Sequence, residues 1–593
     1  MAPTRRSSEH LLSLVLVLVT GAGLWYAHAS AWDLGGRSPI LSYDSAQYAL
    51  AARELAWHGR FGTPFALPVD LAWHASPPWP ISALQPGLLL AEAAIFKLLP
   101  ARGVVTGSDQ RAWLTLILPF VSYLFLGAGT VLGARHLLAR HAADAPRWIR
   151  VGAPAVLGLA VMLDTEAQHF ALAGLTELPF TVLFLLVILG LARGASAEIP
   201  LRYGLVLGLA GLFRANMLWL APLCALGSAW IAPPRLRVRV GTLVLLGYVL
   251  PLCPWWFYKW STFGSPAWDL TRFEVWDQVQ GRDWFQLFHR SEVPQVPHGL
   301  EAARLVAAKS WGNLSKLVLP LLSGPRGLWL GALVSWLLAR PRGMPATAPV
   351  AAPGSPVADA TVAASDSPLA GGPSTRPLAA AALVVLAGLG LNTVAASVGM
   401  PLMRYVFPTR IVAEAAGLLA LGALARRLPG ASERMRAAAC VAAAVLALGW
   451  GVWVTLAGQA ESRATSLERG VPASRTLTAL SVALGQELAP GETVMSNLGP
   501  ALAWQTHHPV IHLAYSPADV NACRIRHDFR HIVLVFRSAA RAWEEWQEIV
   551  ERPGTAETRR ELGVQRERRF QTADGFTVVW LQLGPLPVQV AGL

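Results

Sequence analysis

Hydrophobic residues fill most of this chain in long blocks, which short polar or arginine-rich turns separate. The blocks lie at 11–31, 112–134, 150–163, 177–193, 202–215, 217–232, 240–258, 312–339, 378–397, 406–425 and 437–457. A helix needs roughly 20 apolar residues to cross a bilayer, and several blocks are shorter, so we expect broken or half-buried helices among them. The pattern predicts a polytopic α-helical membrane protein with about eleven transmembrane helices.

The arginines indicate which way the helices run. Arg5 and Arg6 precede the first block and place the N-terminus in the cytoplasm. A further apolar block, 81–99, would put the arginine-rich stretch 135–150 outside if it crossed the membrane. The positive-inside rule disfavours that arrangement, so we interpret 81–99 as lying along the interface. The loops 32–111 and 259–311 and the C-terminal tail then face outward from a plasma (inner) membrane.

The chain divides into a membrane module, 1–457, and a tail, 458–593. Within the module, 32–111 forms the first external loop, and the Pro-, Ala-, Ser- and Gly-rich stretch 341–377 reads as a flexible cytoplasmic linker. The tail carries short β-branched runs that begin near Thr493, Val510, Ile532 and Phe576, with a helix-like stretch at 539–550. It therefore predicts a small extracytoplasmic α/β domain.

Composition supports this interpretation. Of the 593 residues, 54% are hydrophobic and only 14% are charged, with mean hydropathy +0.43. These values exclude a soluble multidomain enzyme and a disordered chain. The formal charge of +13 fits loops that face anionic lipid and does not suggest nucleic acid. The four cysteines have neither a disulfide framework nor metal-type spacing.

Charged residues gather at the predicted outer ends of the helices. They are Asp44, Asp164, Glu166, Glu177, Arg214, Lys259 and Arg404. A charge inside the bilayer costs about 2.5–3.5 kcal/mol even on the lenient insertion scale, so such a residue usually has a partner or a function. Simpler interpretations remain open: Glu177 could stabilise a helix N-terminus, and Lys259 could extend to the interface beside Trp255 and Trp256.

Four segments in this order resemble the GT-C membrane glycosyltransferases, and most nearly the protein O-mannosyltransferases and aminoarabinose transferases. They are Tyr43-Asp44-Ser45-Ala46-Gln47-Tyr48 with the Gly59–Pro64 turn; Leu175-Thr176-Glu177-Leu178-Pro179; Pro254-Trp255 with Phe263-Gly264-Ser265-Pro266; and Arg404-Tyr405-Val406-Phe407-Pro408. The resemblance covers about residues 1–460. The chain departs from the family in two places. Asp44 is followed by Ser45 where many relatives have a second acid, and Gln85-Pro86-Gly87 replaces the usual Lys/His-Pro-Pro element.

The resemblance implies that a sugar moves, with inversion, from a polyprenyl-phosphate donor to an acceptor hydroxyl on the outer face. Asp44 is the expected general base. Glu177 matches the family's second acidic position and is the second expected catalytic residue, and Glu177 or Asp164 would orient the acceptor or bind a sugar hydroxyl. The expected substrate-binding residues are Tyr48, Glu54, Asp164, Glu166, Arg214, Lys259, Arg404 and Tyr405. Arginine suits the lipid phosphate because its guanidinium binds phosphate oxygens in pairs. The acceptor is a glycan, a lipid or a protein. The sequence indicates no cofactor or metal site and leaves a divalent cation open.

Two other functions remain open. A transporter, flippase or ligase of lipid-linked sugars would also need charges along its pathway, but a transporter would favour inverted repeats and ionisable residues near the membrane midplane. A non-enzymatic scaffold would use the tail to bind a partner. The grouping of acids and arginines at one face favours the glycosyltransferase.

Overall fold

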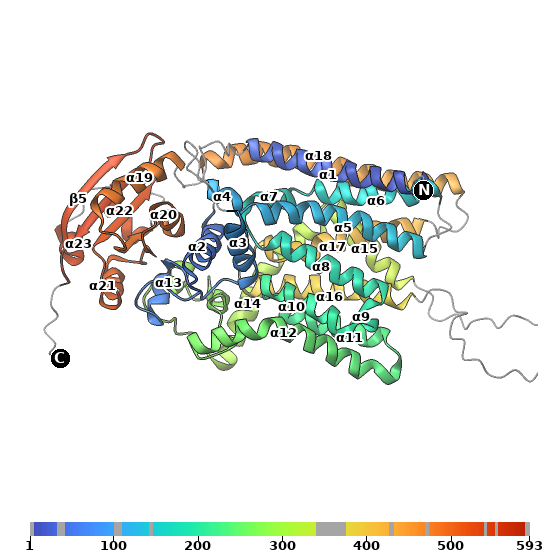
Figure 1. Ribbon diagram of the computed structural model, residues 1–593, viewed down its shortest axis with the longest axis horizontal. Helices are drawn as coiled ribbons and strands as arrows, with labels where there is room; N and C mark the ends of the chain where they lie inside the picture. The colour runs from blue at the N-terminus through green and yellow to red at the C-terminus, as the bar shows by residue number, and fades with distance from the viewer. Residues whose placement is uncertain are drawn as a thin grey trace, which may run out of the picture.

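The computed structural model describes residues 5–31, 42–99, 110–141, 146–339, 375–425, 432–468, 474–538, 543–551 and 556–586. It is elongated, with a bundle of long helices at one end and a mixed α/β domain at the other (Figure 1). The N-terminal end of the first helix lies at the end of the bundle remote from this domain. The predicted linker 341–377 lies almost entirely outside the described residues.

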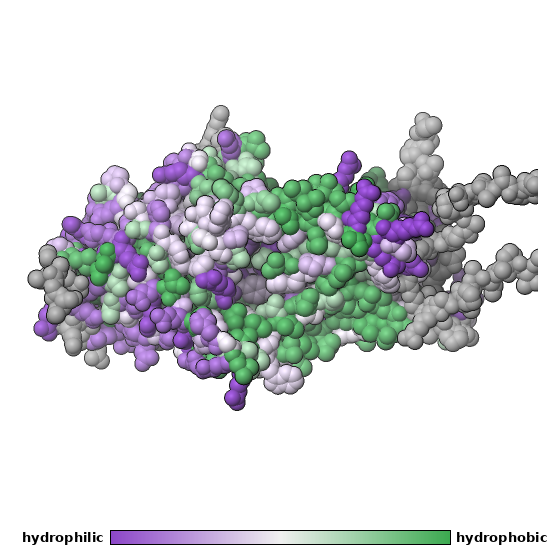
Figure 2. Space-filling view, turned by 90° about the horizontal axis from the view of Figure 1, so that it is seen from below, coloured by the Kyte–Doolittle hydropathy of each residue, from purple (hydrophilic) through white to green (hydrophobic). Residues whose placement is uncertain are grey.

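The bundle has helices at each of the predicted apolar blocks, together with two short helices that no block predicted, over residues 165–173 and 195–198. They are α1 (Arg5–Ala31), α4 (Gln110–Leu114), α5 (Ile117–His141), α6 (Arg147–Met162), α7 (Thr165–Ala173), α8 (Glu177–Arg193), α9 (Ala195–Glu198), α10 (Pro200–Phe213), α11 (Met217–Ile231), α12 (Arg237–Phe263), α14 (Gly299–Leu322), α15 (Pro325–Leu338), α16 (Arg376–Val398), α17 (Phe407–Ala425) and α18 (Glu433–Glu468). Figure 2 shows a hydrophobic surface over this half of the molecule and a more hydrophilic one over the α/β half. The chain is a polytopic helical membrane protein.

Fewer helices are long and apolar enough to span a membrane than the eleven that the sequence predicted. Among the described residues, six helices are long and apolar enough to cross a membrane, or up to eight if each of two bent pairs counts as one span. The pairs are α6 with α7, bent by 57°, and α14 with α15, bent by 88°. Helices α10 and α11 are apolar but have only 14 and 15 residues, which is about 21–23 Å at 1.5 Å per residue. The expected broken and short helices are therefore present.

Glycines let some helices of the bundle approach closely. A Cβ atom on Gly204 of α10 would lie 2.2 Å from the carbonyl oxygen of Val244 in α12, and one on Gly247 of α12 would lie 2.4 Å from that of Leu201. In the same way, a Cβ on Gly417 of α17 would lie 2.1 Å from the carbonyl oxygen of Trp329 in α15. Small residues at such contacts are typical of helix pairs in membranes.

The first external loop forms a layer between the bundle and the α/β domain (Figure 1). Its elements are α2 (Tyr43–His58), β1 (Phe65–Ala66), the 3₁₀ helix η1 (Pro68–Ala72) and α3 (Pro86–Leu98). Helix α2 begins where Ser42 accepts a hydrogen bond from the backbone N–H of Ser45, and it ends at Gly59, whose φ is 65°. Helix α3, which contains most of the block 81–99, packs against α2 and α10; its position along the membrane interface stays a prediction.

The α/β domain has one six-stranded sheet, in the order β1-β3-β2-β4-β6-β5. Its strands from the tail are β2 (Val494–Ser496), β3 (Val510–His512), β4 (His531–Phe536), β5 (Val564–Gln571) and β6 (Thr577–Leu583), and its helices are α19 (Ser474–Glu487), α20 (Gly499–Thr506), α21 (Pro517–Arg526), α22 (Glu544–Glu551) and α23 (Ala556–Leu562). The four predicted strands are present, and the sequence missed β5.

The first loop is built into this sheet. Strand β1 pairs in parallel with β3, with Phe65 opposite Val510. The guanidinium of Arg53 in α2 donates hydrogen bonds to the carbonyl oxygens of Trp504, at 2.9 Å, and Ala503, at 3.1 Å. The boundary at 458 stays a prediction, but the sheet draws strands from both sides of it. The loop between α12 and α14 adds the 3₁₀ helix η3 (Leu270–Trp276) and α13 (Trp284–Phe288), and a second connection adds η4 (Met403–Tyr405).

Candidate active site

Asp44 forms an ion pair with Arg404. The Nη1 atom of Arg404 in η4 lies 2.5 Å from Oδ2 of Asp44, and the two side chains are 31% and 36% exposed. Asp44 lies in the first turn of α2, so the start of that helix fixes its position. Within the described part of the chain, the buried Nε of Arg404 has no acceptor. The pair is therefore accessible and keeps an unused hydrogen-bond donor.

Glu177 and Arg214 form a second pair, which is buried. Nη1 of Arg214 lies 2.8 Å from Oε1 of Glu177, and the side chains are only 8% and 3% exposed. Glu177 is the first residue of α8, and Arg214 directly follows α10. The same Nη1 reaches Oγ1 of Thr176 at 3.5 Å. Oε2 of Glu177 is buried and has no donor among the described residues.

Tyr405 lies between the two pairs. Its ring centre is 5.5 Å from the Cζ atom of Arg214 and 5.2 Å from that of Arg404, which are cation–π distances. Tyr48 of α2 is buried. Its burial is the main cause of the raised pKa of its phenol, and the charges of Glu177, Arg214 and Asp44 also act on it, so Tyr48 lies near both pairs. The structure thus brings together six predicted residues: Asp44, Tyr48, Glu177, Arg214, Arg404 and Tyr405.

Lys259 forms an ion pair with a third carboxylate, that of Asp269. Its Nζ atom lies 3.2 Å from Oδ2 of Asp269, and its side chain is only 7% exposed. The amide of Gln85 donates to the same oxygen at 3.1 Å, and the ring centre of Trp255 lies 5.0 Å from Nζ. Lys259 is therefore held at the junction of the first loop, α12 and the following loop, by an acid that sequence reasoning missed.

Glu274 is another acid that sequence reasoning missed. It belongs to η3, and burial raises its pKa to about 7. The charge of Arg404 opposes this shift, whereas the charges of Asp269, Asp44 and Asp277 add to it. Glu274 therefore lies within electrostatic reach of the Asp44–Arg404 pair. The only sequence signal was an acid enclosed by Phe273, Val275 and Trp276, a setting that favours burial.

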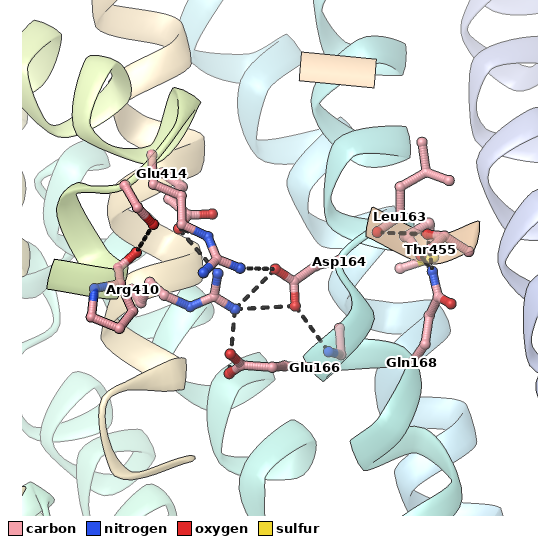
Figure 3. Close-up of polar contacts among 12 residues, drawn as sticks. Leu163, Asp164, Glu166, Gln168, Arg410, Glu414 and Thr455 are labelled. Atoms are coloured by element: carbon pink, nitrogen blue, oxygen red, sulfur yellow. Dashed lines mark hydrogen bonds and ion pairs between the residues drawn. The ribbon is translucent and has the colours of Figure 1, made fainter. Parts of the chain in front are cut away.

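Two predicted residues, Asp164 and Glu166, belong to a separate cluster around Arg410 inside the bundle (Figure 3). Arg410 is fully buried, and its Nη2 lies 2.9 Å from Oδ2 of Asp164 and 3.6 Å from Oε2 of Glu166. Nη1 lies 3.0 Å from Oε1 of Glu414, whose Oε1 is also 3.4 Å from Arg326. Asp164 also caps α7. A cavity of about 60 Å³ borders Asp164, Arg326 and Glu414.

Two acids of the first loop make local contacts. The predicted Glu54 lies 2.5 Å from Nη2 of Arg60. Asp70 accepts hydrogen bonds from Oγ of Ser82, at 2.6 Å, and from the backbone N–H of Leu67, at 2.9 Å. Burial raises the pKa of Asp70 to about 6, although both hydrogen bonds oppose the shift. These contacts fix the shape of the loop that carries Asp44.

The site combines anion-binding and proton-accepting groups. The guanidinium groups of Arg404 and Arg214 can bind phosphate oxygens, and the carboxylate of Asp44 can accept a proton. Among the described residues, no three His, Cys, Asp or Glu side chains are arranged to hold a metal ion. The chemistry that these residues support is therefore the binding of an anion beside a proton acceptor.

Comparison with known proteins shows the fold. No family model and no curated protein sequence matches the chain. The crystal structure of ArnT from Cupriavidus metallidurans bound to undecaprenyl phosphate matches 98% of this chain and 99% of its own, with a TM-score of 0.53 at 13% identity. The chain has the GT-C membrane glycosyltransferase fold. This GT-C fold also appears in the oligosaccharyltransferase of Archaeoglobus fulgidus in complex with Zn and sulfate, with a TM-score of 0.52 at 10% identity over 95% of this chain and 72% of that one.

The predicted GT-C fold and the C-terminal α/β domain are thus confirmed. The roles of the individual site residues stay predictions.

Proposed function

We propose that this protein is a membrane glycosyltransferase, which moves a sugar from a polyprenyl-phosphate donor to an acceptor hydroxyl with inversion. The observation that carries the proposal is the pair of acid–arginine contacts, Asp44 with Arg404 and Glu177 with Arg214, joined by Tyr405. They lie on a GT-C fold, and one protein that shares this fold was crystallised with undecaprenyl phosphate. Lipid phosphates are among the anions available to a protein at the membrane surface.

Arg404 is our candidate for the first contact of the donor phosphate. Its Nε has no acceptor among the described residues, and its side chain is 31% exposed. A phosphate that binds this fork competes with Asp44 for the guanidinium. As Arg404 turns to the phosphate, the Asp44 carboxylate is released next to the acceptor. Donor binding thus prepares the base.

Asp44 then takes the proton of the acceptor hydroxyl, while the oxygen attacks the anomeric carbon and the phosphate leaves from the opposite side. Arg214 and Arg404 stabilise the negative charge that collects on the phosphate. Glu177 holds Arg214 in place, and Tyr405 lies between the two arginines, with its ring facing both. Lys259, paired with Asp269, is a third cation for the donor head group.

The variant Asp44→Asn tests this mechanism. A panel of undecaprenyl-phosphate sugars is incubated with the protein and membrane extract as acceptor, and released undecaprenyl phosphate is measured. We expect Asp44→Asn to lose about 10²–10⁴-fold in rate, because an amide does not accept a proton at neutral pH. Glu301→Gln, which alters an exposed carboxylate of α14, is the control. A rate above a tenth of wild type removes Asp44 from this role, and no release by the wild type rejects the function.

A transporter or flippase of lipid-linked sugars is the second candidate function. It is favoured by the ion-pair cluster around Arg410, because ionisable residues inside a bundle often mark a transport path. Proteoliposomes separate the two functions. A transferase forms a new glycosidic bond and releases lipid phosphate, whereas a flippase moves an intact fluorescent donor between leaflets without consuming it.

The arginine distribution further supports an orientation in the plasma (inner) membrane, with the N-terminus and the linker 341–377 in the cytoplasm and the tail outside. Single cysteines placed in the linker and in the tail test it, in a background where the natural cysteines are replaced. An impermeant maleimide added to intact spheroplasts should label the tail probe alone. Labelling of the linker probe would show that this orientation is wrong.

A further inference from the structure

The amide of Asn392 in α16 is fully buried and hydrogen-bonded on both of its sides. Its Oδ1 atom accepts hydrogen bonds from Nδ2 of Asn216 and from Nε1 of Trp219, each at 2.8 Å. Its Nδ2 atom donates to Oγ1 of Thr409 at 3.1 Å. The hydroxyl of Thr409 in turn donates to the backbone carbonyl oxygen of Val406 at 3.0 Å. Asn392 therefore connects α16 with the start of α11 on one side and with α17 on the other.

The partners of Asn392 lie next to the two arginines of the candidate site. Asn216 is two residues after Arg214, in the short turn between α10 and α11. Its Nδ2 atom also lies 3.4 Å from the backbone carbonyl oxygen of Tyr405, the residue after Arg404. On the other side of the amide, the chain of hydrogen bonds ends at the backbone between η4 and α17. The amide thus links the segment that carries Arg214 to the segment that carries Arg404.

A glycine brings α16 close to both of these neighbouring helices. A Cβ atom on Gly388, one turn before Asn392, would lie 2.7 Å from Cδ2 of Leu220 in α11 and 3.6 Å from Cγ2 of Thr409 in α17. Because α16 packs this closely between them, one short side chain reaches partners on both helices.

Hydrogen bonds from asparagine often stabilise helix pairs in membranes, but the place where these hydrogen bonds end gives Asn392 a second role. Contacts that only held α16 against its neighbours would not need to reach the backbone beside Arg404. The position also requires both halves of an amide. Asn216 and Trp219 are donors, whereas the Thr409 hydroxyl has already given its proton to the backbone and offers an acceptor. An amide accepts and donates at once, so it satisfies both sides.

We propose that Asn392 is a positioning residue, whose amide sets the separation between Arg214 and Arg404 so that both guanidinium groups reach one lipid phosphate. This inference rests on the proposed function. Two groups that bind the same anion from different parts of the chain gain from a fixed separation, because the cost of ordering them is then met in folding and not in binding. Asn392 acts on the phosphate only through the backbone segments that it holds.

The variant Thr409→Val tests the proposal, because valine has nearly the shape of threonine but lacks the hydroxyl that links Asn392 to Val406. The Kd for undecaprenyl phosphate is measured in nanodiscs for the wild type, Arg404→Gln, Thr409→Val and the double variant. In the wild-type background, Arg404→Gln should raise the Kd at least about tenfold, since a charge-assisted contact is lost. In the Thr409→Val background, the same change should raise it by less than about threefold, because the two arginines no longer share the phosphate.

Further variants separate positioning from stability. Thr409→Ser keeps the hydroxyl and loses only a methyl group, so Arg404→Gln should again raise the Kd about tenfold in this background. Asn392→Leu, which removes both halves of the amide, should behave as Thr409→Val does. The matched control is Thr393→Val on α16, where the lost hydroxyl donates to the carbonyl oxygen of Leu389 in the same helix at 2.8 Å; it should keep the full effect. Loss of folded protein lowers the amount of lipid bound but not the ratio of two Kd values.

The outcomes are distinct. If the wild type does not bind undecaprenyl phosphate, or if Arg404→Gln binds it as tightly, the proposed phosphate site is wrong and this inference fails with it. If Arg404→Gln has its full effect in the wild type and also in Thr409→Val and Asn392→Leu, the phosphate site stands and Asn392 does not position it. A Thr409→Ser background that behaves as Thr409→Val does would show that the hydroxyl is not the link, which also overturns the inference.

Discussion

The buried pair of Glu177 and Arg214 allows stability to be separated from catalysis. The two side chains meet at 2.8 Å with 3% and 8% of their surface exposed. Removal of one partner leaves the other charge buried without compensation, which typically costs about 3–5 kcal/mol. Removal of both charges avoids this penalty. We therefore predict that Arg214→Gln and Glu177→Gln each destabilise the protein by about 3 kcal/mol.

The double variant, which lacks both charges, measures the coupling energy between Glu177 and Arg214. Because the two sites are in direct contact, their effects should not add, and we expect a coupling energy of about 2–3 kcal/mol in favour of the double variant. In Glu177→Gln, Arg214 still has its cation–π contact with Tyr405 at 5.5 Å. Glu177→Gln should therefore destabilise the protein less than Arg214→Gln. Reversible unfolding in mixed micelles, with SDS as denaturant, measures all four proteins under one condition.

An exposed arginine provides the matched control. Arg235 lies at the surface, and Arg235→Gln should change the unfolding free energy by no more than about 0.5 kcal/mol. Two results would refute the reasoning: single variants of the pair as stable as the control, or a double variant whose loss equals the sum of the single losses. Either would mean that water or lipid compensates these charges, and that Arg214 is free for a ligand without cost.

Other contacts give predictions of the same kind. Arg404→Gln should weaken undecaprenyl phosphate binding in nanodiscs by at least about tenfold, and Arg404→Lys should recover only part because a point charge lacks the guanidinium fork. Gly417→Ala should destabilise the bundle by about 1–3 kcal/mol in micelle unfolding, whereas Gly422→Ala on the same helix, with no atom within 4 Å, should not. Because burial raises the pKa of Asp70 to about 6, its protonated form stabilises the folded state. This contribution is fully present below about pH 4 and is lost as the pH rises through 6. In Asp70→Asn, the unfolding free energy should no longer fall by up to about 3 kcal/mol over this pH range.

Long apolar runs were sufficient to locate most helices of the bundle, because burial in lipid demands apolar side chains at almost every position of a span. They did not locate the bends. The 88° turn between α14 and α15 occurs at Gly324, where φ is 59°, inside a block that reads as one apolar run. They also gave no sign that β1, only two residues long, joins a sheet about 445 residues further along the chain.

The candidate site was partly predictable for a different reason. Asp44, Glu177, Arg214 and Arg404 stand out as charges at helix ends, and the structure joins them in two pairs. Asp164 has the same signature, yet it pairs with Arg410, which the sequence interpretation had absorbed into an apolar block. Which acid meets which arginine depends on helix packing, and a single sequence does not record that.

The pairing has a consequence for how the donor binds. Since each of Arg404, Arg214 and Lys259 has a carboxylate before any ligand arrives, binding of a phosphate exchanges one anion for another and does not fill an unsatisfied positive site. The net gain in the ground state is small, because the lost ion pairs offset the new ones. As the phosphate departs, its charge grows while that of the carboxylates does not, so the arginines come to favour the phosphate. The arginines therefore stabilise the bound donor only weakly and the transition state more strongly, and this difference increases the rate.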